Sequence, residues 1–427
     1  MKIAHQIDIP AGMKTAVFLL GDGVFQGLPA LWNEFFPGKK PWIIADENTW
    51  NAAGKAVSAA FQMGNIQEEK AKIFPGTPRL MPKRGIADEL AADLHGGIIP
   101  VAVGNGVIND LCKCAAGLAG VPYLCIPTAA SVDGYTTAGA TILDHGVKAN
   151  FKCPPPLAIV ADADVLERAP KSMLACGYAD LFSKITAGAE WLLADALGIE
   201  PIDPVVWKLV QEPLRENLSD PADVQRIFRG LANTGYSMQL YHDSRPAAGS
   251  EHLFSLIWDM EQLNVNGREI PHGIQVGVAT LAVVRLCEFI IHTPVEKARA
   301  LAKPFVSKEE RSAEIDRLLS KGCYGAAKDI ALEKFLEGAA AADRRERIFQ
   351  KWETFQSLMK KQLYSSAEVE NMLKQAGAVT DYREIGLTQD DYLDTPRRAQ
   401  LIRKRYMVLD VLYESGLLDS AVGTLKA

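Results

Sequence analysis

Apolar and polar positions follow two regular patterns over the first third of the chain. Continuous apolar runs, which are typical of buried strands, occupy residues 15–20, 41–45, 98–103 and 123–127. Amphipathic stretches with helical spacing separate them, at residues 24–36, 52–61, 86–94 and 109–118. Strands that alternate with helices in this way form a parallel sheet from βαβ units. The pattern therefore predicts an α/β domain in this part of the chain.

The pattern changes after about residue 170, where strand signals almost disappear. Helical periodicity covers residues 175–196, 221–241, 251–263 and 273–291, and charged amphipathic helices continue through residues 398–413. We therefore predict two domains, an α/β domain over residues 1–165 and an all-α domain over residues 166–427. The sequence carries no internal repeat and no low-complexity segment.

Composition narrows the class of protein. Hydrophobic residues make up 48% and charged residues 23% of the chain, which is typical of a soluble globular protein. The net charge of -6 gives no support for binding to nucleic acid or to an anionic membrane surface. No apolar run reaches the roughly 18 residues of a membrane span, and the N-terminus lacks a signal-peptide pattern. Seven cysteines without metal-type pairs favour reduced thiols, so we expect a cytoplasmic protein.

A glycine-rich turn directly follows the apolar run at residues 98–103. It consists of Gly104, Asn105, Gly106, Val107 and Ile108, and a helix is predicted after it. Glycine lets the backbone approach a pyrophosphate closely, and the free N–H groups of the helix point at the anion. Asn109 stands where the usual dinucleotide fingerprint has its third glycine. A plain strand-to-helix turn therefore remains an alternative.

Two other segments lie at the carboxyl ends of predicted strands, where open α/β sheets bind ligands. Asp46 ends the second strand, and an acid there can bind the ribose hydroxyls of NAD and repel the 2′-phosphate of NADP. An N-cap for the next helix is the simpler interpretation of Asp46. Residues 127–135 follow the fourth strand and contain several hydroxyls and Asp133. A polar loop without a function is the alternative there.

Two histidines and one carboxylate are the candidates for a metal site. His252 and His272 begin predicted helices, and Asp180 lies among small and apolar residues of another predicted helix. A buried carboxylate is costly unless it is paired or bound to a metal. Asp180 and Lys184 also have the spacing of a helix-surface ion pair. Because the chain has no HExxH motif and no paired-cysteine zinc motif, spacing alone proves no metal site.

Several motifs occur in an order that resembles one family. They are ADENTWNAAG from Ala45, GNGVIND from Gly104, PTAASVDGYT from Pro127, GYADLFSK from Gly177, SRPAAGSEH from Ser244, HGIQVGVATL from His272 and KRYMVLDVLYESGLL from Lys404. Together they resemble the glycerol-1-phosphate dehydrogenase family, particularly its bacterial branch. That family belongs to the superfamily of glycerol dehydrogenase, iron-dependent alcohol dehydrogenase and dehydroquinate synthase. The resemblance spans about residues 15–418.

The resemblance implies a fold and an activity. The fold would be a Rossmann-like dinucleotide-binding domain followed by an all-α metal-binding domain, as in dehydroquinate synthase and the iron-dependent alcohol dehydrogenases. The activity would be hydride transfer between NAD or NADP and a small polyol or polyol phosphate, most directly glycerol 1-phosphate and dihydroxyacetone phosphate. We also expect a homo-oligomer, with a homodimer as its simplest form.

The resemblance also implies roles for individual residues. Asp46 would hold the adenosine ribose, and the turn from Gly104 to Ile108 would hold the pyrophosphate. The nicotinamide side would be lined by Thr128, Ala129, Ala130, Ser131 and Thr137. One divalent ion, zinc, nickel or iron, would be bound by Asp180, His252 and His272. Asp133 and Asp180 would be the catalytic carboxylates that contact the substrate. One carboxylate and two neutral imidazoles leave coordination positions open for a substrate hydroxyl.

Leu256 is the clear departure from the family pattern, which has a second histidine four residues after the first histidine ligand. Positions i and i+4 of a helix lie one turn apart on the same face, so Leu256 would face the substrate alongside His252. A hydrogen-bond donor is replaced by an apolar wall, which puts the identity of the substrate in doubt. Thr137 is a smaller departure, because it keeps the hydroxyl of the usual serine.

Two other functions compete with the dehydrogenase. A lyase or cyclase like dehydroquinate synthase would use NAD transiently and release no NADH, and Leu256 argues mildly against it. A non-catalytic binding protein on the same scaffold is the third hypothesis. It would have no need to keep Asp180, His252 and His272 together.

Overall fold

The computed structural model describes residues 6–145, 147–320, 322 and 324–426, and the chain forms two compact units. Unit 1 takes the chain up to Leu181 together with Glu216–His242. Unit 2 takes Phe182–Arg215 together with the chain from Asp243 onward. A segment from the helical half thus returns to unit 1. The division at residue 165 into a cofactor-binding domain and a metal-binding domain stays a prediction.

Unit 1 is built on a six-stranded parallel sheet, which confirms the predicted α/β class. Its strands are β1 (Val17–Gly21), β2 (Lys40–Asp46), β3 (Glu69–Phe74), β4 (Ile98–Gly104), β5 (Leu124–Pro127) and β8 (Ala158–Asp162), in the order β1-β8-β5-β4-β2-β3. The apolar pattern predicts four of these strands and misses β3 and β8. Strand β3 lies at the sheet edge and alternates between half-buried and exposed residues, so it lacks a buried-strand signal.

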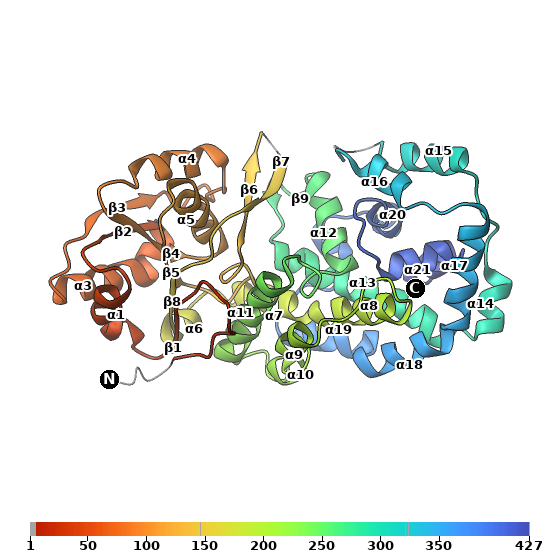
Figure 1. The fold of residues 1–427 in the computed structure, drawn as a ribbon, viewed down its shortest axis with the longest axis horizontal. Helices are drawn as coiled ribbons and strands as arrows, with labels where there is room; N and C mark the ends of the chain where they lie inside the picture. The colour runs from red at the N-terminus through yellow and green to blue at the C-terminus, as the bar shows by residue number, and fades with distance from the viewer. Residues whose placement is uncertain (1–5, 146, 321, 323, 427) are drawn as a thin grey trace. The chain divides into compact units, whose positions relative to one another are not determined.

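Helices cover the sheet of unit 1 (Figure 1). They are η1 (Val24–Gly27), α1 (Leu28–Phe35), α2 (Glu47–Thr49), η2 (Trp50–Gly54), α3 (Lys55–Met63), α4 (Arg84–Asp93), α5 (Gly106–Ala119), α6 (Ala163–Glu167), α7 (Lys171–Phe182) and α11 (Val224–Tyr241). Alternate strand residues such as Val101 and Val103 form one core with Trp32 and Phe61 of α1 and α3. Phe18 of β1 packs edge-on against Phe228 of α11, with the centres of the two rings 5.9 Å apart. The hairpin of β6 (Gly139–Asp144) and β7 (Val147–Lys152) is separate from the sheet.

The order of the strands creates a switch point between β2 and β4. From β2 the chain moves outward to β3, and from β4 it moves the opposite way to β5 and β8. Strands β2 and β4 pair with Ile44 opposite Ala102, a register that places Asp46 level with Gly104 when continued. Gly104 in turn pairs with Pro127 of β5. Ligands of open α/β sheets bind at such a point, outside the carboxyl ends of the strands.

The described residues of unit 2 form helices apart from the two-residue strands β9 (Asn264–Val265) and β10 (Arg268–Glu269). Its helices are α8 (Lys184–Ala196), α9 (Pro204–Val210), α12 (Ser250–Met260), α13 (His272–His292), α14 (Val295–Leu301), α15 (Lys308–Leu318), α16 (Ala327–Glu333), α17 (Gly338–Gln350), α18 (Trp352–Gln362), α19 (Ser366–Gln375), η3 (Tyr382–Ile385), α20 (Gln389–Ala399), α21 (Val408–Glu414), α22 (Leu418–Gly423) and η4 (Thr424–Lys426). Helix α10 (Leu214–Asn217) spans a boundary between the units.

Helix α13 is the central helix of unit 2 and packs against α8, α12, α18 and α19. Among the described residues it is the one helix whose length and apolar composition suffice to cross a membrane. Of its most apolar window, 72% is buried inside the protein, as in the core helix of a soluble protein.

Two helices predicted as continuous are broken. The stretch at residues 175–196 divides into α7 and α8 at Ser183, whose carbonyl accepts a hydrogen bond from the amide of Thr186 at 3.1 Å. The predicted helix at residues 398–413 is also wrong, because α20 ends at Ala399 and α21 begins at Val408. The side chain of Asp410 accepts from the amide of Met407 at 2.9 Å, which starts a new helix at that point.

Candidate metal and cofactor site

The structure brings the three candidate metal ligands together. Each of Asp180, His252 and His272 offers one ligand atom, and these atoms lie within 4.8 Å of one another. Asp180 lies near the end of α7, His252 in the first turn of α12, and His272 at the start of α13. Asp180 is 1% exposed and Lys184 is fully buried, so neither side chain lies on a helix surface. The site is a cluster of one carboxylate and two imidazoles.

The ring of His252 is oriented by the preceding residue. Nδ1 of His252 lies 2.9 Å from Oε1 of Glu251, which is completely buried. Burial raises the pKa of the Glu251 carboxyl, but hydrogen bonds from His252, the amide of Gly249 and the hydroxyl of Thr186 bring that pKa below its ordinary value. An ionised Glu251 accepts the Nδ1 proton of His252, which leaves the lone pair on Nε2 for a metal.

A chain of hydrogen bonds assigns the tautomer of His272 in the same way. The amide nitrogen of Gln275 donates to Asp259 and to the carbonyl of Ile270, both at 3.1 Å, which identifies its other atom as the acceptor Oε1. Ser255 donates its single hydroxyl proton to that Oε1 at 3.0 Å. Its oxygen, 3.1 Å from Nδ1 of His272, therefore accepts the Nδ1 proton. The lone pair of His272 is therefore on Nε2, the atom that could bind a metal.

The loop after β5 positions Asp180. The amide of Asp133 donates to Oδ2 of Asp180 at 3.0 Å. Gly177, one turn earlier on α7, lies against the same loop, because a Cβ at Gly177 would come within 1.9 Å of the carbonyl oxygen of Ala130. The family motifs include Gly177, but nothing in the residue pattern indicates that it packs against the loop after β5. A side chain at Gly177 would displace the loop or the helix.

Lys113 supports the other end of this loop. It is completely buried, and its amino group donates to the carbonyls of Gly134 and Gly139 at 2.6 and 2.9 Å and to the hydroxyl of Thr137 at 2.9 Å. Burial lowers the pKa of Lys113. The hydroxyl of Thr137 is thus part of the loop's internal support. Sequence reasoning missed Lys113, although a lysine among cysteines and alanines of an apolar helix was a usable signal.

The predicted nicotinamide-side residues Thr128, Ala129, Ala130 and Ser131 are all buried. The amide of Thr128 donates to the carbonyl of Gly104 at 3.2 Å, and the carbonyl of Ala129 accepts from the hydroxyl of Tyr135 at 2.6 Å. The first bond joins the loop to the glycine-rich turn at the carboxyl end of β4, and the second closes the loop on itself. The segment is therefore a buried wall of unit 1, and its contact with the nicotinamide stays a prediction.

The glycine-rich turn has packing reasons for both of its glycines. A Cβ at Gly104 would lie 2.6 Å from Cβ of Ile108, and a Cβ at Gly106 would lie 3.2 Å from Val132. Asn105 is the N-cap of α5 and makes no side-chain capping bond. The first amides of α5, which begins at Gly106 and continues through Val107 and Ile108, therefore have no side-chain acceptor from the cap. That geometry suits an anion, while the packing alone already accounts for the glycines.

Asp46 is the N-cap of α2, as the simpler interpretation predicts. Its Oδ1 accepts from the amide of Thr49 at 2.8 Å, and the hydroxyl of Thr49 accepts from the amide of Asp46 at 3.0 Å. The capping bond uses one carboxylate oxygen. Within the part of the chain that the structure describes, no donor is placed on Oδ2. Asp46 can therefore cap the helix and still accept hydrogen bonds from a ligand.

Leu256 lies on α12 one turn after His252 and is half-buried. Ser255, which directly precedes Leu256 and is 1% exposed, contacts Nδ1 of His272. In this turn of α12, Ser255 thus offers a polar contact to a histidine, and Leu256 offers an apolar side chain.

Comparisons with known proteins define the class. Residues 20–170 match the family model of iron-containing alcohol dehydrogenase. The sulfoacetaldehyde reductase of Bifidobacterium kashiwanohense, solved in complex with NAD+, superposes with a TM-score of 0.58, 14% identity and coverage of 99% of both chains. The fold is that of the iron-containing alcohol dehydrogenases and glycerol dehydrogenases.

Sequence relatives define the family within this class. The glycerol-1-phosphate dehydrogenase [NAD(P)+] of Halalkalibacterium halodurans is 32% identical over 324 residues, which cover 70% of this chain and 81% of the relative. The enzyme of the same name from Bacillus subtilis is 30% identical and covers 88% of this chain and 86% of the relative. The chain belongs to the glycerol-1-phosphate dehydrogenase family, which confirms the resemblance.

Proposed function

We propose that this protein is a metal-dependent oxidoreductase that transfers a hydride between NAD or NADP and a small polyol phosphate, most directly glycerol 1-phosphate and dihydroxyacetone phosphate. The observation that carries the proposal is the cluster of Asp180, His252 and His272, whose ligand atoms lie within 4.8 Å of one another. Membership of the glycerol-1-phosphate dehydrogenase family supports the same chemistry.

The donor set fits one divalent ion of the zinc, nickel or iron type. Two neutral imidazoles and one carboxylate suit such ions and leave further coordination positions free. When bound, the ion would supply Lewis-acid polarisation of the reacting oxygen, which is worth several kcal/mol. The chain's own contribution is to hold the ligands. Glu251 and Ser255 orient the imidazoles, and the amide of Asp133 orients Asp180.

The carboxyl edge of the sheet is the proposed cofactor side. Asp46 would accept from the ribose hydroxyls, the turn from Gly104 to Ile108 would receive the pyrophosphate, and the wall from Thr128 to Ser131 with Thr137 would contact the nicotinamide. Support comes from the register, which puts the ends of β2, β4 and β5 level at the switch point. Asp133 would contact the substrate. We further propose that the protein works in the cytoplasm, in line with the buried cysteines of the described residues, which form no disulfide. We also propose that it forms a homo-oligomer.

A panel assay tests this proposal. Metal-loaded protein is mixed with NADH or NADPH and with ketose phosphates, small unphosphorylated ketones and a dehydroquinate-synthase substrate, and the absorbance of the reduced cofactor is followed. We expect it to fall with a ketose phosphate. A product formed without net change in the cofactor would instead favour the lyase, and no reaction with any compound would favour a binding protein.

Replacing Asp46 with asparagine is expected to weaken discrimination against NADPH. The substitution keeps the capping oxygen but removes the charge that repels a 2′-phosphate. We expect wild type to prefer NADH and the variant to shift the ratio of kcat/KM values toward NADPH by roughly tenfold, or about 1.4 kcal/mol. Asp22→Asn is the control, because Asp22 is exposed in the turn after β1. A wild-type preference of tenfold for NADPH would contradict a role for Asp46.

Replacing Leu256 with histidine is expected to improve turnover of dihydroxyacetone phosphate. The variant restores a donor one turn from His252, and a hydrogen bond to a charged group contributes about 1.5–3 kcal/mol. We expect kcat/KM to rise by roughly tenfold for the phosphorylated ketose and to stay unchanged for dihydroxyacetone. Leu256→Gln, which supplies an uncharged donor, separates hydrogen bonding from charge. Equal efficiency in wild type and both variants would show that Leu256 is a neutral substitution.

A further inference from the structure

Unit 2 contains a cavity that none of the metal or cofactor residues lines. Its volume is about 310 Å³, and its walls come from residues 303–306, from α15, α16 and α17, and from the segment between Arg397 and Asp419. This volume lies at the lower end of the range of small-molecule pockets, about 300–1,000 Å³. The cavity is therefore large enough for a compact metabolite.

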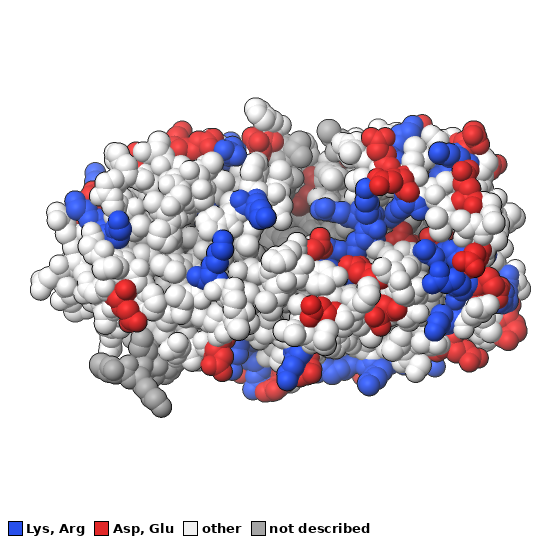
Figure 2. Space-filling view, in the orientation of Figure 1, with Lys and Arg blue, Asp and Glu red and all other residues white. Residues whose placement is uncertain are grey.

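The lining of this cavity is positively charged, although the protein as a whole carries a net charge of -6. Seven lysine and arginine side chains line it, against four aspartate and glutamate side chains. Figure 2 shows Lys and Arg gathered together with acidic residues on this part of unit 2. Such a local excess of cations within an acidic protein favours an anionic ligand.

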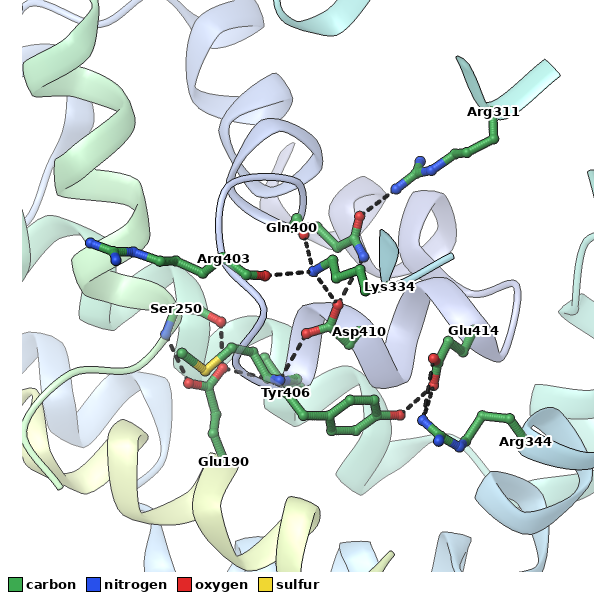
Figure 3. A network of polar contacts seen from close by, with 12 residues as sticks. Glu190, Ser250, Arg311, Lys334, Arg344, Gln400, Arg403, Tyr406, Asp410 and Glu414 are labelled. Atoms are coloured by element: carbon green, nitrogen blue, oxygen red, sulfur yellow. Dashed lines mark hydrogen bonds and ion pairs between the residues drawn. The ribbon is translucent and has the colours of Figure 1, made fainter. Parts of the chain in front are cut away.

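The four carboxylates are already paired with lining cations. The pairs are Glu314 with Arg311, Asp410 with Lys334, Glu414 with Arg344, and Asp419 with Lys303 and Arg397. Lys334 also donates to the carbonyl of Arg403, and the hydroxyl of Tyr406 donates to Glu414, so the wall is a rigid network (Figure 3). Lys404 pairs with Glu333, which does not line the cavity.

Arg345 is the lining cation that these carboxylates leave uncompensated. Its Nε donates to the carbonyl of Glu414 and its Nη1 to the carbonyl of Lys303, both at 2.9 Å, and no described carboxylate lies within ion-pair distance of it. Burial lowers the pKa of Arg345, which is the expected result for a partly desolvated cation without an acid beside it. A ligand carboxylate or phosphate would supply the missing negative charge.

A second donor in the same wall lacks a partner. The side chain of Arg311 is 3% exposed and stacks over the ring of Tyr413 at 3.9 Å, with its terminal nitrogens held by Glu314 and Gln400. Its Nε is buried and has no hydrogen-bond partner among the described residues. Buried donors without a partner are rare in folded proteins and call for an explanation. Because this Nε is closed to solvent, Arg311 is a fixed part of the wall, held by Tyr413, Glu314 and Gln400.

The mouth of the cavity is apolar. Phe305 is 50% exposed and Val306 is 42% exposed, and both line the cavity. The guanidinium of Arg345 lies 3.6 Å from the centre of the Phe305 ring, so the uncompensated cation and the exposed ring adjoin. A ligand with an anionic head and an apolar body would contact both.

We infer that this cavity is a second binding site of the protein, which takes a small organic anion with a carboxylate or phosphate head and an apolar body. Arg345 binds the head, and Phe305 and Val306 cover the body. The site lies outside the metal cluster, so its occupant is a regulator of the enzyme or a structural ligand, and it does not serve as the substrate of the proposed reaction.

Calorimetric titration tests this inference. The full-length protein is titrated with phenyl phosphate and with 3-phenylpropionate, which carry the two heads on the same ring, and with benzyl alcohol as the uncharged probe. Arg345→Met keeps the apolar stem and removes the charge. Arg299→Met is the matched control, because Arg299 also stacks on a ring, that of Phe349 at 4.7 Å, and does not line the cavity.

We expect wild type and Arg299→Met to bind at least one of the aromatic anions, and Arg345→Met to bind it at least about tenfold more weakly. The anion that binds identifies the head as phosphate or carboxylate. Equal binding by Arg345→Met, equal binding of benzyl alcohol, or no binding of either anion to wild type would overturn the inference. If Arg345→Met does not fold, hydrogen exchange of wild type decides, with protection expected at residues 303–306 and 408–414 on addition of phenyl phosphate. Absence of that protection overturns the inference, and neither measurement depends on turnover.

Discussion

His252→Ala is expected to abolish metal binding and to lower kcat by about a thousandfold or more. The substitution removes one of three protein ligands, and the polarisation that a bound ion supplies is worth several kcal/mol, of which each 1.36 kcal/mol is about a factor of ten in rate. We expect wild type to hold about one divalent ion per chain and the variant to hold close to none after dialysis. Elemental analysis and initial rates with dihydroxyacetone phosphate and NADH provide the two readouts.

His292→Ala is the matched control for this experiment. His292 lies at the far end of α13 from His272, is exposed, and is not part of the cluster. It should keep both the ion and the activity. Full metal content and full turnover in His252→Ala would show that the cluster is not the metal site.

Glu251→Gln is expected to weaken metal binding by about 10- to 100-fold, the usual effect of removing a carboxylate that supports a ligating histidine. The amide keeps the shape of the side chain, so it can still accept from Gly249 and His252 and can donate to Thr186. The loss is the negative charge that makes His252 a stronger ligand. Competition with a chelator measures metal affinity, and thermal melting of the metal-free protein measures stability.

A merely structural role for Glu251 makes a different prediction. The metal-free variant would then melt at a lower temperature with its metal affinity unchanged. A second carboxyl, that of Glu190, lies close to Glu251, and burial together with the charge of Glu251 raises the pKa of Glu190 to about 7. The loss of negative charge in Glu251→Gln therefore has to be separated from the effect of Glu190. Glu190→Gln removes that second carboxyl and should change metal affinity much less than Glu251→Gln. Equal losses in the two variants would assign the effect to the buried pair and not to the orientation of His252.

The carboxyl ends of the strands are predictable from the sequence, because each is identified by residues that are neighbours in the chain. A continuous apolar run followed by glycines identifies β4 and the start of α5, and an aspartate after such a run identifies the end of β2. Parallel strands end at the same edge, so these positions meet without further information. The same reasoning fails for β3, which is an edge strand with exposed positions.

The metal cluster is not predictable from spacing because its members come from three separate helices. Asp180, His252 and His272 are distant in sequence, and only the resemblance of several motifs connects them before the structure is known. The supporting residues are harder still. Ser255 and Gln275 have ordinary helical positions, and their function depends on which atom donates to which. Gly177 and Lys113 matter because a loop from another part of the chain lies against them.

The most direct test of the central claim is the reduction of dihydroxyacetone phosphate by NADH in protein whose metal content is measured at each step. The cluster predicts that metal-loaded protein consumes one NADH for each glycerol phosphate formed. It also predicts that chelation stops the reaction, and that zinc, nickel or ferrous iron restores it at about one ion per chain. Turnover that continues in protein stripped of metal would contradict the account, as would a fully metal-loaded protein that leaves NADH unchanged.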